Sequence, residues 1–395
     1  MRSRGVWFAS RRGSVATPCG GQSASMTDTA STDDRRRMWD ASRRAHHLLS
    51  GERPLTMTEQ LERLTAGSAD LDRRGDVYGD GVMRELEERI AAMLGMPDAL
   101  WLPTGTMAQQ IALRCWAERA GTTRVVLHPR HHTLLNEEDA VTALAALTPV
   151  FATEEPRYAT AEETGAAARG AAAVVFEVPF QDLGYELPPW ADFRAAVGAA
   201  RAADAAVHLD GARLWDAAAV WRRDTAEVAA LADSVYLSLY KAPGAMSGAA
   251  LAGDAELIDR ARTWRIRYGG QLFSAWPAVV GALRGLDERV SRVPMWTAHA
   301  GVIAGALDDV GMRPLPSAPR PREFFVRAEA SAADMNRAVL EVTETTGWRF
   351  LHGWWAEEGG GALAEMTTAD PALDWTADDV HRVGRLVADR AGGTR

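Results

Sequence analysis

The feature that most constrains how this chain folds is a regular alternation of short apolar runs with longer segments of helical period, which starts near Met38. The apolar runs that we expect as strands span residues 124–127, 172–178, 206–209, 234–239 and 249–252. We expect helices over residues 83–94, 107–117, 190–203 and 255–266. Strands that alternate with helices in this way are typical of an α/β fold with a mostly parallel sheet.

The chain divides into three segments by composition. Residues 1–37 are rich in Arg, Ser, Thr and Gly and lack the apolar core of a secretory signal, so we expect disorder there. Residues 38–300 carry the alternating pattern of a large domain with an N-terminal arm. Prolines cluster up to Pro321, and the pattern after them ends in an expected helix over residues 377–391. Residues 301–395 are expected to form a small C-terminal α+β domain.

Composition also argues against several classes of partner. The 395 residues include 44 Lys and Arg against 53 Asp and Glu, a net charge of −9, so nucleic acid is not an expected partner. No apolar segment approaches the roughly 20 residues that a membrane-spanning helix needs, so we expect no membrane partner. The two cysteines, Cys19 and Cys115, are far apart and indicate neither a disulfide framework nor a zinc site. We expect a cytoplasmic protein.

Two of the expected strands end in charged residues of opposite sign. Asp210 follows the strand at 206–209, and Lys241 follows the strand at 234–239 just before an Ala-Pro-Gly turn. Lys241 is the only lysine in the chain, which makes a generic surface role hard to accept. Because open α/β sheets bind ligands at the carboxyl ends of their strands, both side chains are expected in one crevice.

A lysine and a carboxylate in one crevice are what pyridoxal 5′-phosphate (PLP) requires. The lysine forms a Schiff base with the cofactor, and the carboxylate keeps the pyridine nitrogen protonated so that the ring accepts electrons. Lys241 and Asp210 are the candidates for these two functions. The alternative is a plain ion pair at the edge of the sheet, which the spacing alone favours equally.

A third element lies at the start of the helix expected from residue 107. Gly105 and Thr106 precede it, where a helix presents free N–H groups and the positive end of its dipole. A phosphate would bind at such a position. The alternative is an ordinary helix cap, which is the more frequent explanation for a threonine at this place when it is considered alone.

Other motifs point away from competing chemistries. The sequence contains no Walker loop, no G-x-G-x-x-G fingerprint, no H-E-x-x-H and no G-x-S-x-G nucleophile elbow. His128, His131 and His132 are close in sequence, but their spacing fits no common helix-borne metal-ligand pair and no cysteine completes a set. We therefore expect no metal, and one of these histidines is better explained as an aromatic stacker or an acid–base group.

Several motifs in the same order resemble those of one enzyme family. Tyr78-Gly79 with Glu85-Leu86-Glu87 is similar to its tyrosine–glycine and leucine–glutamate signature, and residues 103–109 (PTGTMAQ) are similar to its phosphate-binding SGTMAN segment. Residues 208–215 (HLDGARLW) resemble its DGAR motif, and Trp264-Arg265 resembles a pair that follows its cofactor lysine. From about residue 78 to residue 265 the chain thus resembles the threonine aldolase and β-eliminating lyase family of fold-type I PLP enzymes.

The resemblance implies a role for each candidate residue. Gly105 and Thr106 would hold the phosphate, His132 would stack on the pyridine ring, and Asp210 would pair with the pyridine nitrogen. Lys241 would form the Schiff base, and Arg213 would lie near the phenolic oxygen of the cofactor and bind the substrate carboxylate, as a guanidinium fork can. Lys241, His132 and Arg213 are the expected catalytic residues.

The family also implies an activity and an assembly. A small-molecule amino acid with a β-hydroxyl, such as L-threonine or phenylserine, would be cleaved by a retro-aldol reaction to glycine and an aldehyde. Two alternatives stay open: β-elimination, which yields an oxo acid and ammonia, and a PLP-binding homologue without turnover. The expected architecture is a fold-type I, transferase-like domain with a seven-stranded sheet, and the expected assembly is a homodimer or homotetramer.

The chain departs from the family pattern at several positions. Tyr240 precedes Lys241 where many members have serine, and after Gly269-Gly270 the positions of a third glycine and an arginine hold Gln271 and Phe273. The second carboxylate-binding arginine of the small domain has no clear counterpart. Arg327 and Arg349 are the candidates for it.

Overall fold

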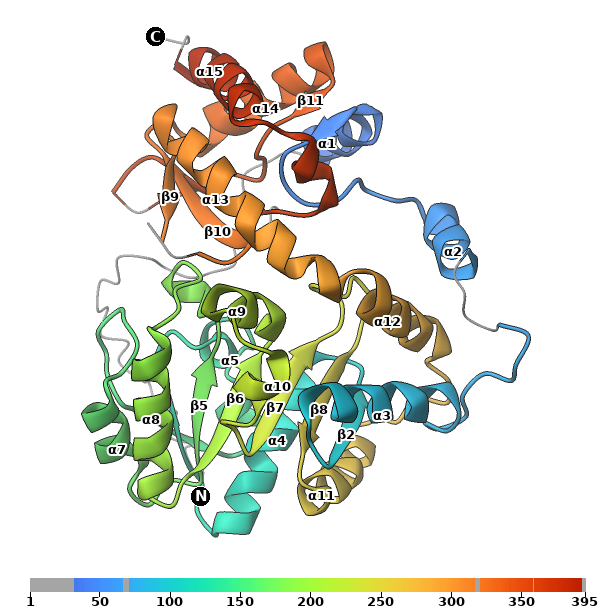
Figure 1. Ribbon diagram of the computed structural model, residues 1–395, viewed down its shortest axis with the longest axis vertical. Coiled ribbons are helices and arrows are strands. Elements are labelled where there is room, and N and C mark those ends of the chain that lie inside the picture. Colours follow the sequence, from blue (N-terminus) through green and yellow to red (C-terminus); the bar gives the residue numbers. More distant parts are fainter. Residues whose placement is uncertain (1–31, 67–70, 317–319, 358, 393–395) are drawn as a thin grey trace, which may run out of the picture.

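A seven-stranded sheet forms the centre of the computed structural model, which describes residues 32–66, 71–316, 320–357 and 359–392 (Figure 1). The strand order is β2-β8-β7-β6-β5-β3-β4. The strands span Asp98–Leu102 (β2), Arg124–Leu127 (β3), Thr148–Phe151 (β4), Ala173–Glu177 (β5), Ala206–Gly211 (β6), Ser234–Ser238 (β7) and Ala249–Gly253 (β8). Strand β8 runs antiparallel to both neighbours and the remaining pairs are parallel. The predicted α/β fold with a mostly parallel sheet is confirmed.

Helices cover both faces of this sheet. They span Val82–Leu94 (α3), Gly105–Ala120 (α4), His132–Leu135 (α5), Ala140–Ala143 (α6), Ala161–Ala168 (α7), Trp190–Ala202 (α8), Leu214–Trp221 (α9), Thr225–Ala229 (α10), Ala255–Arg267 (α11) and Trp276–Glu288 (α12). One core joins the sheet to α4, α6 and α11, and the other joins it to α3, α8, α9, α10 and α12. Burial of both faces explains why the strands read as continuous apolar runs.

Two strands, β2 and β4, lie outside the elements that we expected. Strand β4 is an edge strand that contains Pro149 and is nowhere fully buried, so its sequence lacks an apolar run. Strand β2 is the other edge strand; it has five residues and pairs only with the antiparallel strand β8. Neither strand departs from the predicted class of fold.

A smaller unit follows the central sheet. It contains an antiparallel sheet of order β12-β13-β10-β9 with three helices packed on it. Its elements span Val293–Asp309 (α13), Arg313–Leu315 (β9), Glu323–Ala328 (β10), Ala332–Thr346 (α14), Trp355–Ala356 (β12), Ala362–Thr367 (β13) and Ala377–Gly392 (α15). Within α13, Trp296 belongs to the core of the large sheet and Ala300 to the core of the small one. We therefore propose to place the boundary between the domains at residues 300–301.

The N-terminal segment packs on this smaller unit. Helix α1 (Thr32–Arg44) contacts α14, and strand β1 (His47–Leu48) pairs in parallel with β11 (Trp348–Arg349). Figure 1 shows α1 beside β11, whereas α2 (Met57–Thr65) lies apart beyond α12. The disorder that we expected for residues 1–37 falls mostly outside the described residues. For residues 32–37 it is wrong, because they form the first turns of α1.

The start of helix α4 is set by its local sequence. The side-chain oxygen of Thr104 accepts a hydrogen bond from the N–H of Met107 at 3.2 Å, which caps the helix. At the other end Gly121 has φ of 67°, a left-handed conformation that glycine adopts without strain. Cys115 and Ile111 on the same face are buried against the sheet. None of the helices in the described part of the chain is both long and apolar enough to span a membrane.

Candidate active site

A cavity of about 380 Å³ opens where β6 and β7 end and α4 begins. Its walls include all six residues that the sequence singled out, which are Gly105, Thr106, His132, Asp210, Arg213 and Lys241. These residues come from four separate segments of the chain. Parallel strands and a helix N-terminus meet at this edge of the sheet, as the topology requires.

One end of the cavity is suited to an anion. Helix α4 begins at Gly105, and among the described residues no acceptor is hydrogen-bonded to the backbone N–H of Gly105 or Thr106. A Cβ atom built on Gly105 would lie only 2.1 Å from the hydroxyl oxygen of Tyr236. Thr104 therefore caps the helix, while the next two N–H groups stay available to a phosphate. An ordinary helix cap and a phosphate site are therefore compatible at this motif.

The Gly105→Ala variant tests this end of the cavity. The added methyl group would force Tyr236 or the start of α4 to move. We expect the affinity for PLP to fall by about tenfold or more, because overpacking of this kind costs about 1–3 kcal/mol. Titration of the apo-protein with PLP measures it, and Gly198→Ala is the control because a Cβ at Gly198 meets nothing within 4 Å. Equal affinities for the two variants would contradict the assignment.

Three buried polar side chains form a cluster at the base of the cavity. Asp210 is 2% exposed, and its carboxylate accepts the N–H of Ala212 at 3.1 Å. The Nε2 atom of His131 lies 3.6 Å from Asp210 and 3.9 Å from Glu177, which the β5–β6 register sets opposite Asp210. Burial raises the pKa of Asp210, whereas the neighbouring His132 and Lys241 lower it. A positive group that reached Asp210 would be held firmly there.

The other two members of this cluster are less suited to carry charge. Burial raises the pKa of Glu177 well above its usual value, and Asp210 adds to that shift. Burial also lowers the pKa of His131 to about 3, so its ring is neutral near pH 7. The ligand atoms of His131, Glu177 and Asp210 lie within 4.8 Å of one another, a spacing that a metal ion would also accept. The absence of a metal stays a prediction.

Near pH 7 His132 is neutral, and Lys241 has a neutral fraction that an ordinary lysine lacks. Burial, followed by the nearby charge of Arg213, lowers the pKa of Lys241 to about 8. Lys241 lines the cavity, so its amine is within reach of a ligand there. Burial lowers the pKa of His132 to about 4, although Asp210 opposes the shift. The amide Nδ2 of Asn136 donates to Nδ1 of His132 at 3.2 Å.

Arg213 is held on several sides. Its Nε donates to Glu323, one terminal nitrogen donates to Gln181 at 3.1 Å, and the other donates to the hydroxyl of Tyr185 at 3.1 Å. Burial opposes the charge of Arg213, but Glu323, Tyr185 and Glu365 outweigh it and raise its pKa well above the usual value. Its guanidinium is thus fully charged and fixed in orientation.

The two candidates for a second carboxylate-binding arginine lie elsewhere. Arg327 pairs with Glu357, and Arg349 donates to the backbone oxygen of Ser50. Neither residue lines the cavity. The small domain instead brings two acids, Glu323 and Glu365, to Arg213. These acids follow no motif of the sequence, so only the packing of the two domains reveals them.

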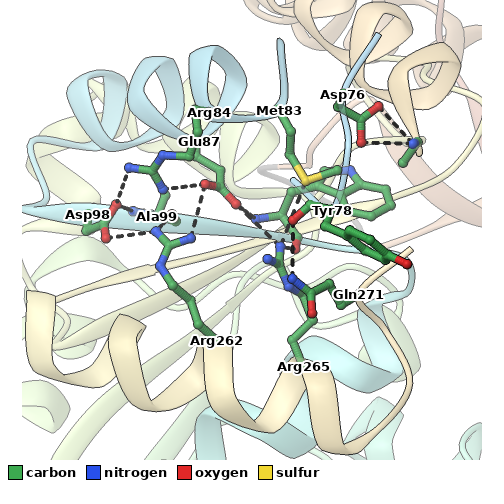
Figure 2. A network of polar contacts seen from close by, with 12 residues as sticks. Asp76, Tyr78, Met83, Arg84, Glu87, Asp98, Ala99, Arg262, Arg265 and Gln271 are labelled. Carbon is green, nitrogen blue, oxygen red and sulfur yellow. Dashed lines mark hydrogen bonds and ion pairs between the residues drawn. The ribbon is translucent and has the colours of Figure 1, made fainter. Parts of the chain in front are cut away.

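The signature motifs away from the cavity meet in one network (Figure 2). Glu87 on α3 is 1% exposed and is surrounded by Arg84 at 2.5 Å, Arg262 at 3.3 Å and Arg265 at 3.6 Å. It also accepts the backbone N–H of Trp101 at 2.9 Å. This network joins α3, β2 and α11, and β2 leads directly into the loop before α4. The network therefore fixes β2 against α3 and α11, a few residues before the anion end of the cavity.

The residues that depart from the family pattern after Gly270 contact Tyr78. Gln271 donates to the backbone oxygen of Tyr78 at 3.3 Å, and the N–H of Tyr78 donates to the oxygen of Phe273 at 2.9 Å. A Cβ on Gly270 would lie 2.2 Å from the sulfur of Met107 in the first turn of α4. The loop therefore packs beside the start of α4, where a larger residue at Gly270 would disturb it.

Sequence reasoning missed several residues of the cavity wall. Glu177 ends a buried strand as Asp210 does, and the same rule of strand ends could have identified it. Glu137 and Tyr236 gave no such signal. Burial raises the pKa of Glu137 to about 7, and its carboxylate accepts from Gln110 at 3.1 Å.

The beta-eliminating lyase family model matches residues 56–329 of the chain. The protein belongs to the beta-eliminating lyase family. The expected family and fold class are thus confirmed, and so are the expected enzyme class and cofactor: the protein is a PLP-dependent lyase.

Relatives and solved structures agree with this assignment. A low-specificity L-threonine aldolase of Candida albicans is 27% identical over 276 residues, which cover 66% of this chain and 73% of that protein. The corresponding enzyme of Escherichia coli K12 is 25% identical, over 60% of this lyase and 72% of its own length. The crystal structure of a putative L-allo-threonine aldolase from Listeria monocytogenes has a TM-score of 0.83 at 28% identity, and covers 90% of this chain and 99% of its own.

Proposed function

We propose that this lyase cleaves an L-amino acid with a β-hydroxyl group, similar to L-threonine or phenylserine, into glycine and an aldehyde. One observation carries the proposal: a reactive lysine, a buried carboxylate, a fixed arginine and a free helix N-terminus open on the same cavity. The names of the relatives from Candida albicans and Escherichia coli support the same reaction class. The roles of the individual residues are part of the proposal.

The residues of the cavity fit PLP. The free N–H groups of Gly105 and Thr106 would hold its phosphate, Asp210 would hold its pyridine nitrogen, and Lys241 would bind its aldehyde carbon. His132 lines the cavity between these ends and would cover the face of the ring. When bound, the cofactor supplies an electron sink for the bond that breaks at the α-carbon.

The remaining work falls on side chains of the protein. Arg213 is proposed to bind the carboxylate of the substrate and so fix which bond at the α-carbon breaks. The structure supports a particular role for His132: because Nδ1 accepts from Asn136, the neutral ring carries its proton on Nε2. His132 would thus donate a hydrogen bond to a water, and the hydroxyl proton of the substrate would pass through that water to the solvent outside the cavity. When the product leaves, Lys241 would again be free or would hold the cofactor.

A product assay tests the proposed reaction. We expect purified enzyme with PLP to form glycine and the matching aldehyde from L-threonine or L-phenylserine in equal amounts. Arg213→Lys is the matched variant because it keeps the charge and loses the planar fork, so KM should rise by about tenfold or more. If the assay instead yields an oxo acid and ammonia and no glycine, the reaction is β-elimination and not retro-aldol cleavage.

We further propose that the enzyme is a homodimer or homotetramer. Tyr240 and Met246 line the cavity, yet they are 49% and 55% exposed. Tyr78, Leu272 and Phe273 are also exposed, and the rings of Tyr78 and Phe273 lie 5.4 Å apart. Large apolar groups at the mouth of a cavity are suited to a subunit contact. Light scattering that showed only monomer would exclude this assembly.

A cytoplasmic location also stays a proposal, based on the sparse cysteines.

A further inference from the structure

Four side chains of alternating charge form a series that connects the two domains beside the cavity. Arg213 donates to Glu323, the other oxygen of Glu323 lies 2.7 Å from Arg322, and Nε of Arg322 lies 2.8 Å from Asp216. Arg213 and Asp216 belong to the large domain at the start of α9, whereas Arg322 and Glu323 belong to the small domain at the start of β10. All four side chains are at least 93% buried. Their formal charges sum to zero.

In this series of charges, Glu323 lies behind Arg213 as seen from the cavity. Arg213 lines the cavity and Glu323 does not, so a ligand would contact only the arginine. Glu323 is firmly ionised: burial disfavours its charge, but Arg213 and Arg322 lower its pKa to about 2. A second acid of the small domain, Glu365, lies 4.0 Å from a terminal nitrogen of Arg213. The positive charge of Arg213 is therefore largely compensated before any substrate binds.

We propose that Glu323 is a specificity-determining residue that weakens the hold of Arg213 on the carboxylate of the substrate. The inference rests on the proposed function, in which Arg213 binds that carboxylate. A substrate carboxylate and Glu323 compete for one guanidinium. Arg213 then binds the carboxylate of an amino acid only weakly, which favours release of the small amino-acid product. Selection between substrates is left to contacts with the rest of the substrate.

The sign of the effect follows from two opposing contributions. Removal of the charge of Glu323 takes away a repulsion between two carboxylates on either side of one guanidinium, which strengthens binding of the ligand. Removal of the carboxylate also loosens Arg213, which weakens binding. In Glu323→Gln the amide oxygen still accepts from the guanidinium, and Gln181 and Tyr185 still hold its terminal nitrogens. The loss of repulsion is therefore expected to dominate.

Ligand binding to the PLP-loaded enzyme tests the proposal apart from turnover: because L-serine itself carries a β-hydroxyl, the absorbance change is read before product accumulates. The probes are L-serine and ethanolamine, which share an amine and a hydroxyl but differ in the carboxylate, and each is titrated by the change in absorbance of the bound cofactor. We expect Glu323→Gln to bind L-serine about tenfold more tightly than the wild type, with little change for ethanolamine. Asp216→Asn is the matched control, because it removes an acid of the same series of charges whose carboxylate pairs with Arg322 and not with Arg213.

A purely structural role predicts a different pattern. Both variants would then lose thermal stability to a similar degree, and the ratio of the two affinities would stay at the wild-type value in both. That result, or weaker binding of L-serine by Glu323→Gln, would overturn the proposal. So would a wild type that does not bind L-serine in preference to ethanolamine, including one that binds neither. If Glu323→Gln does not fold, Glu323→Asp decides, since its shorter carboxylate should strengthen L-serine binding by a smaller factor.

The outcomes also separate this inference from the proposed reaction. An enzyme that yields no glycine from any β-hydroxy amino acid, yet binds L-serine more tightly after Glu323→Gln, would refute the reaction and keep the inference. An enzyme that forms glycine and shows equal L-serine affinities in the wild type and in Glu323→Gln would refute the inference and keep the reaction.

Discussion

Replacement of Lys241 by alanine is expected to abolish the absorbance of lysine-bound PLP and to reduce turnover by about 10³-fold or more. Lys241 is the only lysine of the chain, so no second amine can take its place. Its amine lines the cavity, and its pKa of about 8 leaves a usable neutral fraction near pH 7. Ultraviolet–visible spectra of the purified proteins, followed by glycine assays, measure both effects.

Lys241→Arg is the control for this prediction. It keeps a positive charge in the cavity but provides no amine that can bind the aldehyde carbon of the cofactor. Both variants should therefore lack the absorbance band of lysine-bound PLP. Lys241→Arg should retain more affinity than Lys241→Ala for the phosphate group of PLP. A band that persists in Lys241→Ala at the wild-type position would show that the cofactor is bound by another group.

The Asp210→Asn variant is expected to lower kcat by about 10²- to 10⁴-fold, the range that a well-placed proton-holding group contributes. An amide of the same shape cannot hold a proton on the pyridine nitrogen, so the ring would accept electrons less readily. Steady-state kinetics with L-threonine measure the loss. Glu177→Gln is the matched control, since Glu177 is a buried acid opposite Asp210 in the β5–β6 register. Equal losses in the two variants would contradict the assigned role.

The stability of the apo-protein separates this loss of activity from a loss of fold. Burial raises the pKa of Asp210 in the folded protein above its unfolded value. A carboxyl with a raised pKa stabilises the fold at low pH, and that contribution is lost as the pH rises through the folded pKa. Above its folded pKa the ionised Asp210 of the apo-protein is thus a cost, and Asp210→Asn should unfold at the same or a higher temperature than the wild type.

The same buried charges connect cofactor binding to stability. His131, Glu177 and Asp210 are all more than nine-tenths buried, and the cluster has no formal positive charge of its own when His131 is neutral. A cofactor whose nitrogen carries a proton would supply that charge, and a ligand that binds only the folded protein stabilises it. The site therefore carries an electrostatic cost in the apo-protein that its cofactor offsets.

Much of the fold was encoded locally. Apolar runs identified five strands of the central sheet, and Thr104 with Gly121 set the ends of α4. The two edge strands were not predicted: β4 is half-exposed, and β2 was missed although it is as long as β5, β7 and β8. The rule that ligands bind at strand ends then placed Asp210 and Lys241 in one cavity, because it depends only on strand direction.

Only the tertiary structure decided what surrounds Arg213. Glu323 lies 110 residues along the chain from Arg213, and no spacing or motif connects them. The N-terminal arm gave no local signal either, since β1 pairs with β11 some 300 residues away. The sequence by itself determined five of the seven strands, the start of α4 and the placement of Asp210 and Lys241 in one cavity, because each depends on local pattern and strand direction. The charges that tune the substrate end depend on how two domains pack, and packing brings together residues that the sequence keeps far apart.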